Sequence, residues 1–236
     1  MSDYQALERR FQEILDLKQR PVAVIISGEA PAGVDKFSGT VPAGCAFWRV
    51  AAEGRTFSTT PSDHYNCPIG SHTHHIPLPP ERANDLPAVL ETMVNIGYLK
   101  MEEVPGIPVL PETPENVVYA PLGDSPADPD VVLFVAPASK LMMLEEAAIR
   151  AGVSAKLPLL ARPTCMAIPA ALAHGMVTSA GCIGNRIYTH IGDDAMYAAV
   201  PGRALESIAR ELDTVAAANA VLTQYHRERQ KSLSTV

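Results

Sequence analysis

Residues 116–136 read NVVYAPLGDSPADPDVVLFVA, and this stretch decides the fold that we expect. It holds two runs rich in β-branched and aromatic residues, Asn116–Leu122 and Asp130–Ala136, around a segment rich in Pro, Asp and Gly. Runs of this kind between turn residues are typical of buried strands. A similar run, PVAVIIS at Pro21–Ser27, predicts a further strand.

Other elements follow from the same patterns. Helical periodicity predicts helices at Tyr4–Lys18, Arg82–Leu99, Ser139–Ala151, Ala167–His174 and Pro201–Arg229. Thr56–Thr60 and Met176–Ala180 are predicted strands, Cys45–Val50 is either a short helix or a strand edge, and Asp63–Pro80 is predicted to be irregular. Because strands and helices alternate, we expect an α/β or mixed α+β fold, with a central sheet, flanking helices and a long C-terminal helix.

The length of the chain sets its domain organisation. At 236 residues it can bury a core as a single globular domain, 1–236. Its two parts contain a loosely similar pattern: Thr59-Thr60 precedes Cys67-Pro-Ile-Gly in the first, and Thr178-Ser179 precedes Cys182-Ile-Gly in the second. A degenerate duplication, with halves near 1–115 and 116–236, therefore stays open.

Composition excludes several classes of partner. A net charge of -7 argues against nucleic acid and anionic membranes. The first twenty residues lack the apolar stretch of a signal peptide, and no stretch approaches the roughly 18 apolar residues of a membrane span. We therefore expect a cytoplasmic protein. Thiols stay reduced there, so the cysteines are expected to be metal ligands, catalytic groups or core residues instead of disulfides.

The four cysteines stand in four separate motifs, each beside small residues. The motifs are Gly44-Cys45-Ala-Phe-Trp, Asn66-Cys67-Pro-Ile-Gly70, Arg162-Pro-Thr-Cys165 and Gly181-Cys182-Ile-Gly184. Thiolates suit zinc, copper(I) and iron–sulfur clusters, but the paired Cys-x-x-Cys spacing of zinc sites is missing. Scattered cysteines favour a cluster, and Gly70 and Gly184 would let the backbone approach it closely.

The predicted ligands are therefore Cys45, Cys67, Cys165 and Cys182, around an iron–sulfur cluster of the 4Fe-4S type. Three ligands would leave one iron open, whereas four are typical of an electron carrier. Cys165 could instead enter a helix core, and free cysteine often behaves as a small buried hydrophobe.

Candidate catalytic groups surround these motifs. Histidines gather near Cys67, namely His64, His72, His74 and His75, and His190 follows Cys182. Imidazoles act as acids and bases near neutral pH and also bind metal ions or haem iron. Asp63 could orient His64, and Arg186 or Arg49 could bind an anionic substrate. We predict catalytic roles for Asp63, His64, His74 and Arg186; each could instead belong to a polar loop or a surface ion pair.

Several motifs together carry a resemblance over nearly the whole chain. They are Pro21-Val-Ala-Val, Gly44-Cys45-Ala-Phe-Trp, Asp63-His-Tyr-Asn-Cys67-Pro-Ile-Gly70, and Gly181-Cys-Ile-Gly-Asn-Arg186 followed by Asp193 and Ala199-Val-Pro-Gly202. In this order the chain resembles the uncharacterised ArCR family (domain of unknown function 169). The resemblance implies a prokaryotic soluble protein defined by its cysteine and glycine motifs, without an agreed activity. The histidine-rich continuation from His72 to His75 belongs to only part of such a family, and we expect it to tune the site to one substrate or cofactor.

These observations predict an iron–sulfur enzyme that acts on a small anionic substrate, in a desulfidase or lyase-like reaction with the open iron as Lewis acid. A non-enzymatic haem or metal protein, such as a carrier, sensor or electron-transfer partner, is the alternative. A plain small-molecule binding domain with buried cysteines is the third. The chain has no phosphate-binding loop, dinucleotide fingerprint or nucleophile elbow. The Pro201–Arg229 helix could also support a homodimer.

Overall fold

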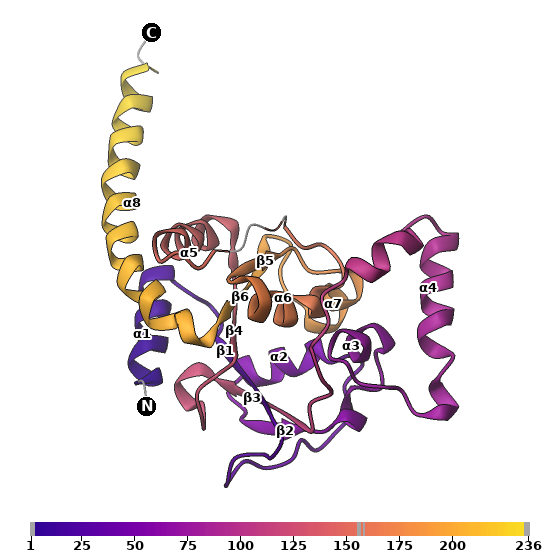
Figure 1. Ribbon diagram of the computed structural model, residues 1–236. Helices are drawn as coiled ribbons and strands as arrows, with labels where there is room; N and C mark the ends of the chain where they lie inside the picture. The colour runs from indigo at the N-terminus through magenta and orange to yellow at the C-terminus, as the bar shows by residue number, and fades with distance from the viewer. Residues whose placement is uncertain (1–2, 155–156, 158, 234–236) are drawn as a thin grey trace.

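One antiparallel sheet of six strands organises the molecule (Figure 1). The structure is a computed structural model that describes residues 3–154, 157 and 159–233. The strands stand in the order β2-β3-β1-β4-β6-β5. Their bounds are β1 Val22–Ser27, β2 Phe57–Thr59, β3 Asn116–Pro121, β4 Val131–Pro137, β5 Val177–Ser179 and β6 Ala195–Pro201. The expected central sheet with flanking helices is confirmed, in its mixed α+β form.

The strand order repeats across the centre of the sheet. On one side β1 is innermost, β3 next and β2 at the edge; on the other side β4, β6 and β5 take the same places. Within each set the chain visits the inner, then the edge, then the middle strand. The predicted duplication stays a prediction, but this is the order that a duplication produces. The change-over falls between β3 and β4, after the predicted boundary near residue 115, because β3 pairs with β1 and β2.

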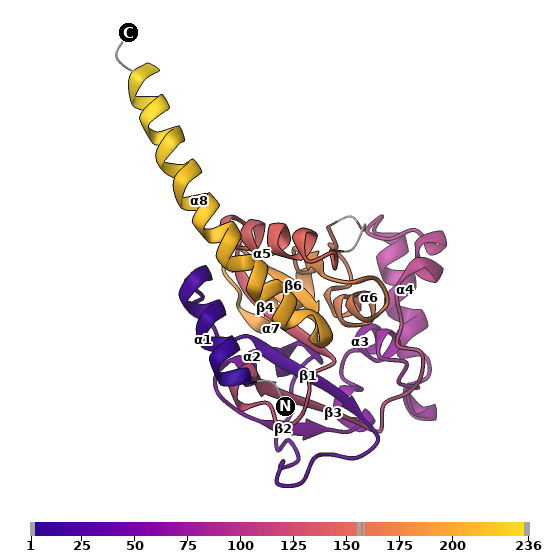
Figure 2. The same cartoon turned by 60° about the vertical axis from the view of Figure 1, so that its left-hand side comes forward.

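Helices cover both faces of the sheet (Figures 1 and 2). One face packs on α1 (Tyr4–Leu15), α5 (Ala138–Arg150) and the start of α8 (Leu205–Leu233). The other face packs on α2 (Cys45–Ala52) and α6 (Ala167–His174), with α7 (Ile183–Thr189) against α2. α3 (Pro68–Thr73) lies beside the short 3-10 helix η5 (Thr164–Met166) on the same side.

The central strands are buried on both faces. Along β4, Val131 and Leu133 pack toward the α2 and α6 layer, whereas Val132 and Phe134 pack toward α1, α5 and α8. A strand covered on both faces reads as a continuous apolar run instead of an alternating one. That is why β1, β3 and β4 could be predicted from short apolar runs, while the face that each side chain occupies could not.

Several elements differ from the sequence prediction. The stretch Asp63–Pro80, predicted to be irregular, contains the six-residue helix α3, and Cys45–Val50 is helical in α2. The helix α7 and the strand β6 were not predicted. Both are hard to recognise, because α7 is a single short helix with an internal Gly184, and β6 contains three alanines, which have low strand propensity.

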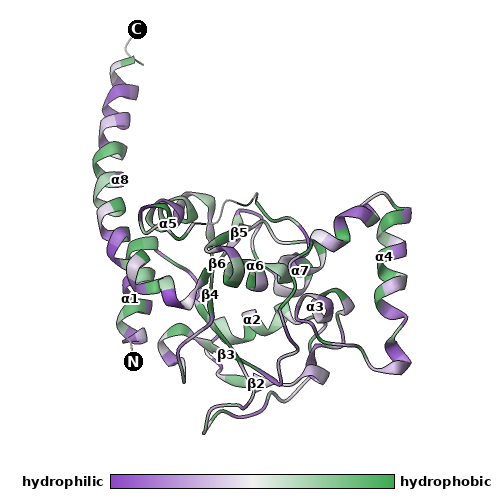
Figure 3. Ribbon diagram, viewed as in Figure 1, coloured by the Kyte–Doolittle hydropathy of each residue, from purple (hydrophilic) through white to green (hydrophobic). Residues whose placement is uncertain are grey.

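Two segments project from the body. The arm, residues 77–109, carries α4 (Asp85–Asn95) and the 3-10 helix η3 (Met101–Gly106), and no residue of α4 is buried. The second half of α8 extends away from the sheet in both views, and its apolar side chains Val221, Leu222 and Tyr225 are exposed. Figure 3 shows hydrophobic residues along both projecting helices. Among the described residues, no helix is both long and apolar enough to cross a bilayer.

The core under α1 gives a test of this packing. Phe134 is fully buried and meets the Phe11 ring edge-to-face at 5.0 Å between centroids. We expect Phe134→Ala to lower the free energy of unfolding by about 3–5 kcal/mol, because it leaves a cavity and removes an aromatic pair. Ile96→Ala, at a side chain on the arm that is 72% exposed, should change it by less than about 0.5 kcal/mol. Urea denaturation of both variants measures this, and equal losses would contradict the packing described.

Candidate functional site

The four cysteines come from corresponding places in the two halves of the sheet. Cys45 lies between β1 and β2, and Cys67 between β2 and β3; Cys165 lies between β4 and β5, and Cys182 between β5 and β6. Cys45 is the first residue of α2, and Cys67 and Cys182 are the N-cap residues of α3 and α7. Cys165 lies in η5. Cys45 and Cys165 are buried, and the other two are half-buried.

The fold brings all four thiols into one region. Each thiol lies near enough to the other three for their charges to interact, so all six pairs are coupled. The sequence prediction grouped these cysteines from motifs that lie up to 137 residues apart, from Cys45 to Cys182. Segments far apart in the sequence therefore meet on the side of the sheet that α2 and α6 cover.

The environment of the thiols favours their protonated form. The pKa of the Cys45 thiol is raised to about 12, mainly by burial and to a smaller extent by the neighbouring Cys67 and Cys182. Burial also raises the pKa of Cys67 and places that of Cys165 well above the ordinary range. Thiolates in this region therefore need a positive partner, and a bound metal would release their protons.

Polar contacts tie the cysteine segments together. The Gly70 N–H donates to Cys67 Sγ at 3.3 Å, and the Cys182 N–H donates to Thr164 Oγ1, next to Cys165. The side chain of Asn185 lies against the Cys45 thiol, and that of Thr73 against the Cys165 thiol; each partly offsets the rise in pKa. Each cysteine is thus held by a group from its own or a neighbouring segment.

Two buried histidines lie beside the cysteine region with their tautomers fixed by carbonyl groups. Thr59 Oγ1 donates to the Val117 carbonyl, so it accepts from His64 Nε2–H at 2.9 Å, and His64 Nδ1 is left as an acceptor. Nδ1 faces Gly44, where a Cβ would stand 3.0 Å away. His74 Nδ1 donates to the Gly70 carbonyl at 3.0 Å, which leaves Nε2 with a lone pair. The centroids of the His64 and His74 rings lie 5.5 Å apart.

Burial keeps both histidines neutral. It lowers the pKa of His64 to about 3, with a smaller contribution from His74, and it lowers the pKa of His74 to about 4. At neutral pH each ring is therefore neutral and has a lone pair that can accept a proton. Because the two pKa values are so low, only a strongly acidic group would protonate either ring. The predicted acid–base role of these histidines stays a prediction, and their placement is compatible with it.

Buried polar atoms without a partner gather in the same region. Among the described residues they include His74 Nε2 and Asn185 Oδ1, together with Trp48 Nε1 and Tyr119 Oη, which lie beside each other without a well-aligned hydrogen bond. Cys45 and Cys165 raise the pKa of Tyr119 beyond the effect of burial, which places its hydroxyl near both thiols. Unpaired buried polar atoms are rare in folded proteins, and a missing group is one explanation for them. Tyr119 and Trp48 were not predicted, because within an apolar strand and helix they read as core residues.

The remaining predicted residues have structural partners. Asp63 accepts from the Thr60 N–H at 2.7 Å and closes the turn before His64. Arg186 donates to three carbonyl oxygens, those of Ala180, Gly192 and Ala195. Its guanidinium therefore holds the loops on both sides of α7 and is committed to the backbone. Arg49 pairs with Glu53 across one helical turn.

The remaining predicted residues do not all lie beside the thiols. One glycine borders a cysteine, whereas two of the histidines line a separate cavity. Gly70 borders Cys67, with its amide on the sulfur, and Gly184 packs under the Tyr188 ring. His72 and His75 instead line a cavity between α3 and the arm. The sequence placed all the histidines around one site, but α3 separates them, with His74 buried on one side and His72 and His75 on the other.

The donor set does not form a compact site for one ion. Among the described residues, no three His, Cys, Asp or Glu side chains stand close enough together to bind a single metal ion. A mononuclear site needs its donors within about 2.0–2.3 Å of one ion, whereas the irons of a cluster each take a separate cysteine.

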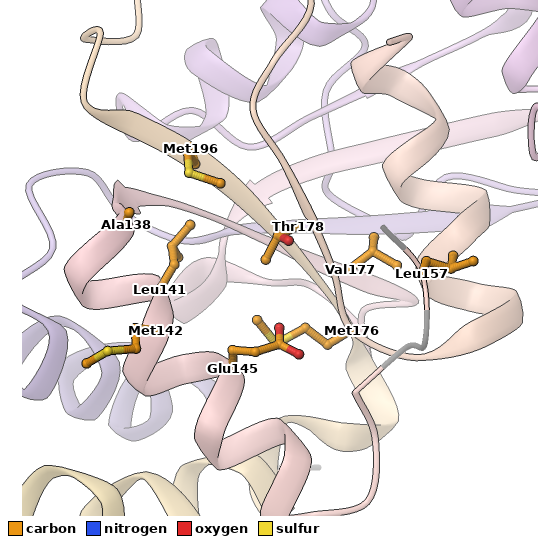
Figure 4. Close-up of a pocket in the computed structure, with 9 residues that line it drawn as sticks. All are labelled: Ala138, Leu141, Met142, Glu145, Leu157, Met176, Val177, Thr178 and Met196. Carbon is orange, nitrogen blue, oxygen red and sulfur yellow. The ribbon is translucent and has the colours of Figure 1, made fainter. Parts of the chain in front are cut away.

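A separate cavity lies away from these residues. It has a volume of about 190 Å³ between α5 and the strands β5 and β6, and Figure 4 shows its lining. Met176 and Met196 contribute thioether groups, and the carboxylate of Glu145 accepts from Ser154 Oγ. None of the predicted site residues lines it.

The buried histidines predict how stability depends on pH. Their folded pKa values lie below the unfolded value of about 6.5, so the unfolded state binds more protons below that pH. The contribution of these histidines to the free energy of unfolding should be fully present above pH 6.5. Below that pH the free energy of unfolding should fall by about 1.4 kcal/mol per pH unit for each histidine, down to pH 4. Denaturation of the metal-free protein between pH 7.5 and 4.5 measures this slope.

His64→Gln should flatten the slope by the share of one histidine, because the amide can still donate to Thr59 but does not titrate. His226→Gln, at an exposed position on α8, is the matched control and should leave the slope unchanged. Identical slopes in wild type and His64→Gln would contradict the neutral, buried state of His64.

Comparison with known proteins identifies the family. No curated protein and no solved structure matches this chain. One family model does match, over residues 10–211, a span that contains all six strands and all four cysteines. The chain therefore belongs to the family described as uncharacterised ArCR, a domain of unknown function numbered 169.

Proposed function

We propose that the protein is an iron–sulfur enzyme in which Cys45, Cys67 and Cys182 hold a four-iron cluster, with Cys165 beside it. The observation that supports this proposal is the convergence of four cysteine thiols, two buried and two half-buried, from both halves of the sheet. The unpaired His74 Nε2 supports it, and the buried hydroxyl of Tyr119, beside Trp48 Nε1, lies near the thiols of Cys45 and Cys165.

The three proposed ligands share a local structure that Cys165 lacks. Cys45, Cys67 and Cys182 each stand at the start of an α-helix, where backbone N–H groups without helical partners can donate to sulfur. One such bond exists already, from Gly70 N–H to Cys67 Sγ. Cys165 lies in a 3-10 turn, and its thiol has the Thr73 side chain as partner. Three ligands leave one iron without a protein ligand.

When bound, such a cluster would supply a Lewis-acidic iron that takes a sulfur, halide or hydroxyl group from a small substrate, as in a desulfidase or lyase. The anionic group of the substrate would meet positive charge at that iron, because the Arg186 guanidinium is committed to backbone carbonyls. Arg186 and Asp63 act as positioning residues. His74, neutral and with a free lone pair on Nε2, is the proton acceptor.

Substitution of single cysteines tests the ligand set. Protein purified without oxygen should be brown, with broad absorption near 400 nm, iron and acid-labile sulfide. Cys45→Ser, Cys67→Ser and Cys182→Ser should each lose most of the iron and sulfide, whereas Cys165→Ser should retain them. Equal loss in all four variants would indicate four ligands and an electron carrier instead of an enzyme. A sharp Soret band would favour the haem alternative, and a colourless protein that cannot be reconstituted would overturn the proposal.

The proposal places the protein in the cytoplasm, where a reducing environment preserves thiols and clusters. It also includes a homodimer formed by the free half of α8. The apolar stripe that begins at the buried Leu205, Ile208 and Leu212 continues with Val215 and Leu222 beyond the body of the molecule. An exposed apolar stripe that extends a buried one is typical of a helix that pairs with another.

Light scattering tests the dimer directly. The wild type should have twice the chain mass of 25.2 kDa, and a Val221→Glu, Leu222→Glu double variant should have the mass of one chain. Gln224→Glu adds a charge to the same turn outside the stripe and should remain dimeric. A monomeric wild type would overturn this part of the proposal and leave the cluster unaffected.

A further inference from the structure

A cavity of about 630 Å³ lies between α3 and the arm, and no part of the proposed cluster site uses it. Its walls are mainly apolar and come from Pro68, Ile76, Pro77, Leu78, Ala83, Leu86, Pro87 and Val109. Three polar side chains, His72, His75 and Thr113, complete the lining. This volume is within the range of about 300–1,000 Å³ that is usual for small-molecule sites.

The polar side of the cavity is fixed in place. His75 Nδ1 lies 2.9 Å from the Leu110 carbonyl, which can only accept, so Nδ1 carries the proton and Nε2 of the neutral ring is an acceptor. Thr113 Oγ1 donates to the His75 carbonyl, and Leu110 N–H donates to the Thr73 carbonyl at 2.9 Å. The segment that follows the arm, with Leu110 and Thr113, is therefore bound to the end of α3 and to His75 itself.

The His75 backbone also departs from the ordinary conformation. Its φ of 57° lies in the left-handed region, which non-glycine residues seldom adopt. Such strain tends to persist where surrounding contacts over-determine a residue at a functional site. Here the hydrogen bonds at Leu110 and Thr113 supply those contacts.

The lining specifies the chemistry of the ligand. The residues that form this cavity include no Asp, Glu, Lys or Arg, so nothing in the wall compensates a formal charge. The apolar walls suit an aliphatic or aromatic body, and the acceptor at His75 suits one hydroxyl or thiol group. Pro68, in the wall, directly follows Cys67, so one helix, α3, carries both the thiol at its start and the histidines of the cavity.

We propose that this cavity binds a small apolar alcohol or thiol and, if the cluster is present as proposed above, serves as its substrate pocket. The exposure of α4 fits a wall that must admit a ligand: none of its residues is buried, although Leu86 and its neighbours are apolar.

Calorimetry with 2-naphthol tests the pocket in the full-length protein. Leu86→Glu places a charge in the apolar wall and should weaken binding at least about tenfold. Ile96→Glu adds the same charge to the arm at a side chain that is 72% exposed and outside the lining, and should leave binding unchanged. Equal affinities in wild type and Leu86→Glu would overturn the pocket, whatever the oligomeric state of the variant.

A second ligand tests the acceptor. 2-Methoxynaphthalene has the same rings without a donor and should bind the wild type about two- to tenfold more weakly than 2-naphthol, the usual range for one hydrogen bond. His75→Asn, a residue that tolerates the left-handed conformation, should remove that difference. If the methoxy compound binds wild type as tightly as 2-naphthol, the assigned role of His75 is wrong.

The link to the cluster has its own readout. Naphthalene-2-thiol should change the absorption near 400 nm of cluster-loaded wild type, but not of loaded Leu86→Glu. Ligand binding without that change would overturn the substrate role. Ligand binding by a protein that holds no iron would mean that the cluster proposal fails while the pocket stands.

Discussion

The antiparallel pairing of β1 with β4 is the interaction on which the rest of the structure depends. Val22, Ala23 and Val24 lie opposite Leu133, Val132 and Val131, and among the described residues this short ladder is the only strand pairing between the two sides of the sheet. Because each side carries its own three-strand set, the pairing fixes how the connections of one set meet those of the other. Two cysteines come from each set, so their convergence follows from this central contact.

Burial then decides what the thiols can do. Neutral cysteine is readily buried in an apolar interior, and the raised pKa values of Cys45, Cys67 and Cys165 favour the protonated thiol in the metal-free protein. A structural role would need nothing more. The free lone pair on His74 Nε2 is harder to explain as packing, since it forfeits a hydrogen bond that water would supply. It is one reason for proposing a bound group near the thiols.

Much of this could be predicted from the sequence, for identifiable reasons. Strands buried on both faces give continuous apolar runs, so β1, β3 and β4 were recognisable, and the cysteines were conspicuous beside glycines and turns. The two short helices that begin at Cys67 and Cys182 were missed, because six or seven residues show too little periodicity. The commitment of Arg186 to carbonyl groups and the separation of His72 and His75 from His74 depend on tertiary contacts that no local pattern encodes.

X-ray absorption at the iron edge of the reconstituted protein tests the central claim most directly, namely that thiols from both sides of the sheet hold one polynuclear cluster. The account predicts sulfur as the nearest neighbour of iron and a second shell of scattering from iron itself, both lost in Cys182→Ser. Iron surrounded by nitrogen and oxygen alone, or sulfur ligation without an iron–iron shell, would contradict it.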